Sequence, residues 1–248
     1  MPAGTRTSLV ANAAAAVPLL LAAMHDCLAR GGRPVVGFAT GATFAPFLGA
    51  LAAEFVAGRV RPDAFVATHL DEYEGFPPDR RGGMVHELFA ACPALRTMHE
   101  HGAFWPVPAV ADAAAIAAHE RRLGAAGGVA LQFVGIGRNG HVAFHEPGVP
   151  LSTGFHEARL AAPTRDDARS RFAPEEPPLR AITSGVATIR AARTVVLCAF
   201  GSAKAAAMRA MAEGPPSAQC PASGLRDHAD LRVVLDGAAA SGARGAFA

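Results

Sequence analysis

The stretch PVVGFATGATFAPFLGALAAEFV, residues 34–56, decides the fold class of this chain. Its first six residues, Pro34–Ala39, form a short apolar run, which predicts a strand buried on both faces. Small and hydroxyl-bearing residues follow at 40–43, and from about Phe44 to Val56 apolar residues recur at helical spacing. A buried strand followed directly by a turn and a helix is the repeating unit of a parallel α/β sheet.

The same alternation continues along the rest of the chain. Short apolar runs predict further strands at 64–70, 131–136, 194–199 and 231–235. Apolar periodicity predicts helices at 83–91, 109–123 and 202–211, and a loop through Trp105 and Pro108 lies between the first two. We therefore expect a single-domain α/β fold, a Rossmann-like three-layer sandwich whose mainly parallel sheet carries helices on both faces.

No internal repeat or long linker interrupts the sequence, so one domain is expected over residues 1–248. The segment 163–178 is charged and rich in proline, which predicts a mobile lid around 160–180. The stretch Leu9–Met24 is nearly apolar, but it is too short for a membrane span and is interrupted by Asn12 and Pro18. We expect a first helix of a soluble protein there, and no membrane partner.

Composition excludes several functional classes. Apolar residues make up 51% of the chain and charged residues 18%, which supports a sizeable core and argues against disorder or a coiled coil. A net charge of +2 gives no electrostatic footprint for nucleic acid. Four cysteines lie far apart with no CxxC pair, so neither a disulfide framework nor a zinc ribbon is indicated, and a reducing cytoplasm is the expected location.

Chemistry is expected at three loops that follow strands, because open α/β sheets bind ligands at the carboxyl ends of their strands. The first is Thr40-Gly41-Ala42-Thr43, between a strand and a helix. Small residues let backbone N–H groups approach an anion, and the helix N-terminus adds a favourable dipole. No Gly-Lys-Ser/Thr follows, so the loop is not a Walker A motif. A phosphate-binding turn and an ordinary tight turn both fit this loop.

The second loop begins with the acid pair Asp71-Glu72, followed by Tyr73, the only tyrosine of the chain. Two carboxyl groups directly after a buried strand are held on a rigid element, where one can act as a base while the other shapes its surroundings. A solvated turn that caps a helix explains the same residues.

The third loop runs from Gly135 to Gly148 and reads GIGRNGHVAFHEPG. Its GxGxxG spacing resembles a dinucleotide fingerprint, but Pro147 arrives too soon for the helix which that motif must open. His141 and His145 with Glu146 resemble a metalloprotease box, yet the acid follows the wrong histidine. We therefore expect no metal and no organic cofactor. The favoured interpretation is a loop, cleared by glycines such as Gly137, that presents His141 as an acid/base oriented by Glu146.

Two cations downstream are suited to binding a phosphate with the Thr40–Thr43 loop. Lys204 is the only lysine of the chain and opens a helix just after a strand. Arg171 is one of many arginines, so its position alone says little.

These motifs occur in the order and spacing of a known family. The segments FATGAT at 38–43, DEY at 71–73, GIGRNGH at 135–141 with FHEP at 144–147, SRF at 170–172 and GSAKA at 201–205 resemble those of glucosamine-6-phosphate deaminases/isomerases. The likeness runs from about residue 35 to 240. The related 6-phosphogluconolactonases share the Gly/Thr loop and a Gly-His loop, but typically lack the Phe-x-Glu-Pro ending.

The resemblance implies conversion of glucosamine 6-phosphate and water to fructose 6-phosphate and ammonia, without a metal or cofactor. It implies that Asp71 moves a proton between C2 and C1, and that His141 opens the sugar ring with help from Asn139 and Glu146. The phosphate would be held by Thr40, Gly41, Ala42, Thr43, Arg171 and Lys204, and Glu72 and Gly137 would support the substrate site.

Some positions depart from the family pattern. Phe44 stands where proline is common and His145 where asparagine is usual, and both are expected to border the sugar. A different epimer, such as galactosamine 6-phosphate, is therefore an open alternative, as is lactone hydrolysis. The sequence leaves the oligomeric state open.

Overall fold

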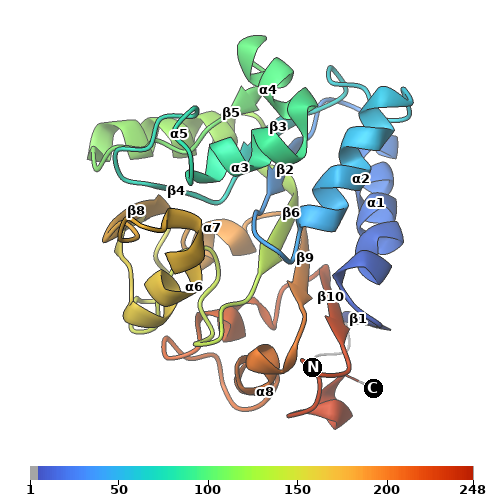
Figure 1. Cartoon of the computed structure of the whole chain (residues 1–248). Helices are drawn as coiled ribbons and strands as arrows, with labels where there is room; N and C mark the ends of the chain where they lie inside the picture. Colours follow the sequence, from blue (N-terminus) through green and yellow to red (C-terminus); the bar gives the residue numbers. More distant parts are fainter. Residues whose placement is uncertain (1–4, 248) are drawn as a thin grey trace.

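The computed structural model describes residues 5–247, leaving 1–4 and 248 of the expected domain outside the description. Its centre is a seven-stranded, wholly parallel sheet (Figure 1). From one edge to the other the strands are β1 (Arg6–Val10), β10 (Leu231–Asp236), β9 (Thr194–Ala199), β6 (Val129–Gly135), β2 (Val35–Phe38), β3 (Val66–His69) and β5 (Phe104–Trp105). This arrangement confirms the parallel α/β fold.

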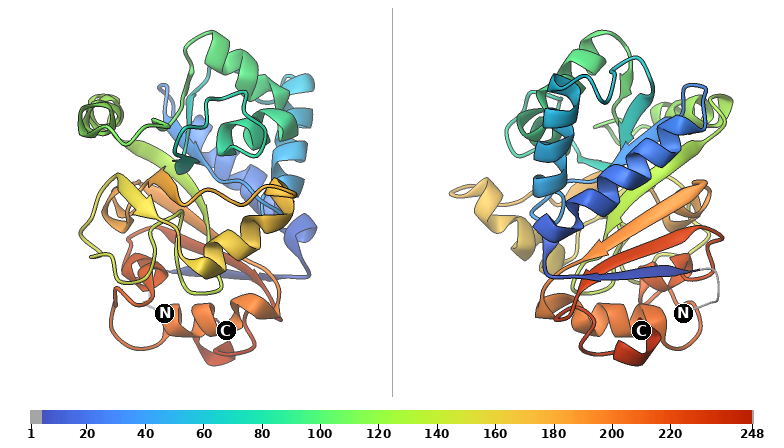
Figure 2. Two further views of the ribbon diagram at one scale, coloured as in Figure 1. Left: turned by 60° about the vertical axis from the view of Figure 1, so that its left-hand side comes forward. Right: turned by 90° about the vertical axis from the view of Figure 1, so that its right-hand side faces the viewer.

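Helices cover both faces of the sheet, so the three-layer prediction is also confirmed. One face packs against α1 (Ala13–Ala29), α2 (Ala45–Val56), α3 (Met84–Ala91) and α4 (Pro93–Glu100). The other packs against α5 (Ala113–Ala125), α7 (Val186–Arg190) and α8 (Ala205–Ala212), as the views in Figure 2 show. Short 3₁₀ helices lie at Ser202–Lys204, Pro221–Leu225 and Arg244–Ala246.

The order of the strands reverses between β2 and β6. After β2 the chain moves outward through β3 to β5, whereas after β6 it moves the opposite way through β9 to β10. The two connections leave the sheet in opposite directions, which opens a crevice above the carboxyl ends of β2 and β6. The Thr40–Thr43 loop and the His141 loop follow these two strands.

A second, smaller sheet lies beside the main one and was not predicted. It is antiparallel, in the order β4 (Asp71–Tyr73), β8 (Arg180–Thr183), β7 (His156–Arg159). Helix α6 (Ala162–Phe172) packs on it through a separate apolar core that includes Tyr73, Phe144 and Phe172. In the right-hand view of Figure 2, α6 stands out from the body of the molecule. The expected lid segment is therefore partly helical.

Two regions differ from the sequence-based prediction. Residues Arg6–Val10 form the edge strand β1, paired with β10, and the first helix begins only after Asn12, whose side chain accepts a hydrogen bond from the Ala15 N–H. The expected loop before Trp105 contains α4 and the two-residue strand β5. Both β1 and β5 depend on pairing with strands distant in sequence, which local periodicity does not reveal.

The position of α6 depends on Phe172. Its ring meets Tyr73 and Phe76 edge-on, with centroids 5.2 and 5.8 Å apart. We expect Phe172→Ala to lower the free energy of unfolding by about 3 kcal/mol, because a buried aromatic ring is replaced by a void. Phe172→Leu fills most of that volume and should cost about 1 kcal/mol. Urea denaturation checks this, and equal costs for both variants would contradict it.

Candidate functional site

A cavity of about 510 Å³ occupies the crevice above β2 and β6. Its walls come from the loops after β2, β3, β6 and β9 and from one side of α6. Most of the predicted site residues line it: Thr40, Gly41, Ala42, Thr43, Asp71, Gly137, His141, Arg171 and Lys204. The fold thus gathers at one place residues that are up to 164 positions apart in the chain.

One part of the cavity is suited to an anion. The Thr40–Thr43 loop leads into the N-terminus of α2, whose dipole favours negative charge. Arg171, from the last turn of α6, and Lys204 line the same cavity. Burial lowers the pKa of Lys204, and the nearby Asp167 carboxylate partly opposes this shift. An anion bound in this part of the cavity would interact favourably with the N-terminus of α2 and with the Arg171 and Lys204 side chains.

Asp71 is the first residue of β4 and lines the cavity. Burial raises the pKa of its carboxyl to about 8, the Glu72 carboxylate adds to the rise, and the Arg171 guanidinium opposes it. A carboxyl group with a pKa near neutrality can both accept and return a proton at physiological pH, which suits a general acid/base.

Glu72, the neighbour of Asp71, has a different surrounding. It is 1% exposed, and its carboxylate accepts hydrogen bonds of 2.9 Å from the backbone N–H groups of Tyr73, Met84 and Val85. Two of these donors belong to the first turn of α3, so Glu72 anchors the start of that helix. Adjacent side chains of a strand point to opposite faces, which places Asp71 toward the cavity and Glu72 behind its wall. Glu72 therefore holds the wall of the site in place and does not itself face a ligand.

His141 projects into the cavity from the loop after β6. Its Nδ1 atom lies 3.1 Å from the Thr164 hydroxyl and 3.7 Å from Glu146 Oε2. Burial lowers the pKa of His141, while the Glu146 carboxylate opposes the shift, so the neutral imidazole is favoured. With Nδ1 facing these groups, Nε2 is the ring nitrogen available to a ligand.

Asn139 and Glu146 hold this loop together through hydrogen bonds. The Asn139 amide donates to Glu146 Oε2 at 3.0 Å, and its carbonyl oxygen accepts from the His141 N–H at 3.2 Å. Glu146 Oε1 accepts from the Ala161 N–H at 3.1 Å. The three predicted residues are therefore joined in one network, in which Asn139 and Glu146 organise the loop that carries His141.

Two glycines make the loop conformation possible. A Cβ atom on Gly137 would lie 2.3–2.5 Å from ring atoms of His141, so only glycine lets the imidazole lie against the backbone there. Gly140 has a φ of 87° and lies against Cys220, whose sulfur would be 2.8 Å from an added Cβ. The backbone of the loop therefore packs against the His141 ring at Gly137 and against the buried Cys220 thiol at Gly140.

Phe44 and His145, the two positions that depart from the family pattern, have different surroundings. Phe44 lines the cavity, as expected. His145 does not border it, and that expectation was wrong. It is 0% exposed, its Nδ1 accepts from the Val186 N–H at 3.2 Å, and its Nε2 faces the Val149 carbonyl at 3.2 Å. The side chain serves to join two backbone segments, and sequence spacing alone does not show which way it turns.

Sequence reasoning also missed two cavity residues that touch predicted ones. Met84 has its sulfur 3.0 Å from the Thr40 hydroxyl and 3.8 Å from an Arg171 nitrogen. Thr164 contacts His141 as described above. Neither belongs to a recognisable motif, because each reaches the site from an element distant in sequence.

The described residues contain no group of three or more histidine, cysteine, aspartate or glutamate side chains placed to hold a metal ion. Metal-independent activity stays a prediction. In the same part of the chain, each helix is too short or too polar to cross a membrane.

Comparisons with known proteins point to one family. Residues 7–234 match the family described as glucosamine-6-phosphate isomerases/6-phosphogluconolactonase. Glucosamine-6-phosphate deaminase of Beutenbergia cavernae is 38% identical over 240 residues, covering 94% of this chain and 90% of the relative. The enzyme of the same name from Shewanella loihica is 40% identical over 212 residues, covering 84% and 78%.

Solved structures of similar proteins include members of the same family. A monomeric glucosamine-6-phosphate deaminase superposes with a TM-score of 0.86 at 26% identity, covering 96% of this chain and 99% of the other. The 6-phosphogluconolactonase of Trypanosoma brucei has a TM-score of 0.76 at 17% identity, with coverage of 96% and 98%, which shows a shared fold.

The contact between Gly137 and His141 can be tested directly. We expect Gly137→Ala to reduce turnover by about 100-fold or more, because the added methyl displaces the imidazole from its place. Gly135→Ala is the matched variant, since its Cβ would meet only Phe44 at an ordinary 3.7 Å. Thermal unfolding checks that both variants fold, and a folded Gly137→Ala enzyme with turnover equal to that of Gly135→Ala would contradict this role.

Proposed function

The chain belongs to the glucosamine-6-phosphate isomerase/6-phosphogluconolactonase family, and we propose that it converts glucosamine 6-phosphate and water to fructose 6-phosphate and ammonia. The observation that carries this proposal is the pairing, in one cavity, of a carboxyl with a raised pKa, Asp71, and a neutral imidazole, His141. Aldose–ketose isomerisation needs a base for carbon, and ring opening needs an acid/base for oxygen.

The phosphate of the substrate anchors it. We place this dianion between the Thr40–Thr43 loop, Arg171 and Lys204, where the helix N-terminus and two cations offset its charge. Anchoring one end fixes the sugar relative to Asp71 and His141, and this orientation supplies part of the rate enhancement. Glu72 contributes indirectly, because it holds the start of α3 and therefore Met84 against Thr40 and Arg171.

His141 opens the ring. Its Nε2 atom takes the proton of the C1 hydroxyl and delivers one to the ring oxygen, while the C1–O bond to the ring breaks and the open-chain aldehyde forms. The Glu146 carboxylate, 3.7 Å from Nδ1, stabilises the imidazolium that forms in between.

Asp71 then moves a proton between carbons. It removes the C2 proton while the aldehyde oxygen at C1 takes up a proton, which gives an enol-amine. It then returns the proton to C1 as the amino nitrogen gives one up, which leaves a 2-imino sugar with a C1 hydroxyl. Water adds to this imine and releases ammonia, leaving fructose 6-phosphate. The substrate's amino group, when protonated beside Asp71, lowers the pKa of the carboxyl and so favours the ionised base once substrate is bound.

Three finer proposals accompany this function. Residues 160–180, including α6, act as a lid over the bound substrate. The dispersed cysteines, all free and buried, favour a reducing cytoplasmic compartment. The Phe44 side chain in the cavity leaves galactosamine 6-phosphate as a second candidate substrate of the same reaction.

Ammonia release from a panel of hexosamine 6-phosphates tests the function, with 6-phosphogluconolactone hydrolysis measured in parallel. We expect ammonia release by the wild type and a loss of about 10²–10⁴ in kcat for Asp71→Asn, since the amide cannot accept the C2 proton. Binding of inorganic phosphate should survive in the variant. Lactone hydrolysis without ammonia release, or near-normal turnover by Asp71→Asn, would overturn the proposal.

The titration of Asp71 gives a second test. Because its pKa is raised to about 8, the carboxyl of the free enzyme should stay protonated below that pH and ionise as the pH rises through it. Carbon-13 NMR of the carboxyl carbons follows this directly, and the signal is assigned by its absence from Asp71→Asn. A midpoint near the ordinary aspartate value of about 4 would show that the site is not desolvated.

A further inference from the structure

The N-cap residue and first turn of α6 lie against the loop that carries His141. Three contacts join them: the Thr164 hydroxyl to His141 Nδ1 at 3.1 Å, the Ala161 N–H to Glu146 Oε1 at 3.1 Å, and an Arg138 nitrogen to the Pro163 carbonyl at 3.1 Å. The first of these contacts reaches the acid/base itself. Thr164 is 5% exposed, so water does not compete freely for its hydroxyl.

The hydrogen-bond partner of the imidazole is therefore the threonine and not the carboxylate. Glu146 Oε2 lies 3.7 Å from Nδ1, which is too long for a hydrogen bond, and this oxygen already accepts from the Asn139 amide at 3.0 Å. Glu146 supplies charge at a distance, whereas Thr164 supplies the direct contact. Orientation of an imidazole depends on the directional contact.

We propose that Thr164 is a positioning residue for His141, accepting a hydrogen bond from its Nδ1–H and thereby holding the Nε2 lone pair toward the substrate. This rests on the proposed function, in which Nε2 exchanges protons with the sugar. A proton on Nδ1 is also the arrangement that the nearby Glu146 carboxylate favours. Nδ1 keeps its proton throughout ring opening, so the same hydrogen bond persists in the neutral and protonated imidazole.

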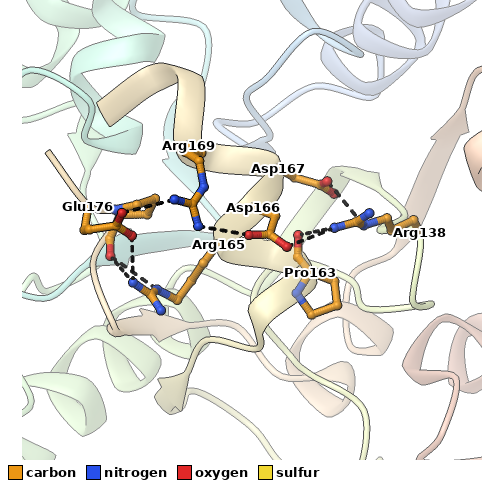
Figure 3. A network of polar contacts seen from close by, with 8 residues as sticks. Arg138, Pro163, Arg165, Asp166, Asp167, Arg169 and Glu176 are labelled. Carbon is orange, nitrogen blue, oxygen red and sulfur yellow. Dashed lines mark hydrogen bonds and ion pairs between the residues drawn. The ribbon is translucent and has the colours of Figure 1, made fainter. Parts of the chain in front are cut away.

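The surrounding ion pairs hold Thr164 in place. Figure 3 shows Arg138, from the His141 loop, reaching both the Pro163 carbonyl and the carboxylates of Asp166 and Asp167. Further along α6, Arg165 and Arg169 both contact Glu176, which ties the helix to the segment that follows it. The orientation of His141 is therefore coupled to the position of α6, a helix outside the main sheet.

The test compares Thr164→Val, which keeps the shape and removes the hydroxyl, with Thr164→Ser, which keeps the hydroxyl. We expect Thr164→Val to lower kcat for glucosamine 6-phosphate by about tenfold, the effect of one lost hydrogen bond, with KM little changed. Thr164→Ser should retain kcat within about twofold. Thr97→Val, the same change at an exposed threonine of α4 that does not line the cavity, should match the wild type.

A second measurement separates positioning from a structural effect. The open-chain amino alditol phosphate made by reducing the substrate needs no ring opening, so Thr164→Val should bind it as the wild type does. Unchanged kcat in Thr164→Val, no rescue by Thr164→Ser, or an equal loss of affinity for the open-chain compound would overturn the inference. Wild-type enzyme that releases no ammonia would instead refute the proposed function, and the two failures are thus distinguishable.

Discussion

The parallel pairing of β2 with β6 is the constraint on which the rest of the molecule depends. Val35 pairs with Val129 and Val36 with Leu131. After β2 the chain continues toward one edge of the sheet, and after β6 it continues toward the other edge. The crevice that results needs no special residues, because it follows from the order of the strands. The anion-binding loop and the histidine loop lie close together for the same reason. Altered pairing at this point would separate the two halves of the site.

Asp71 and Glu72, two adjacent carboxyl groups, acquire different chemistry from their surroundings. Asp71 faces the cavity, where burial raises its pKa to about 8. Glu72 is also buried, but its carboxylate accepts hydrogen bonds from three backbone N–H groups, which oppose the rise that burial causes in its pKa. The same residue class therefore yields a proton carrier at one position and a helix anchor at the next. The alternation of side chains along β4 assigns the two roles.

Much of the fold and site could be predicted because it is encoded locally. The strand, turn and helix over 34–56, the acid pair after β3 and the glycine-rich loop after β6 each have a short signature, and the fold brings them together. The edge strand β1 and the small antiparallel sheet were missed, since both exist only through distant partners. Thr164 was missed for the same reason, lying 23 positions from the histidine that it contacts. The orientation of the His145 side chain could not be predicted either, because its ring accepts a hydrogen bond from a backbone N–H 41 positions away.

The close contact between Gly140 and Cys220 has a consequence for chemical durability. Burial raises the pKa of the Cys220 thiol, so little of the reactive thiolate forms near neutral pH. The sulfur is pressed against the backbone of the histidine loop, at a position where even a methyl group on Gly140 would collide with it. An oxygen or alkyl group added to this sulfur would have to be fitted beside the loop. We therefore expect the packing of the loop to slow oxidation of the thiol beneath it.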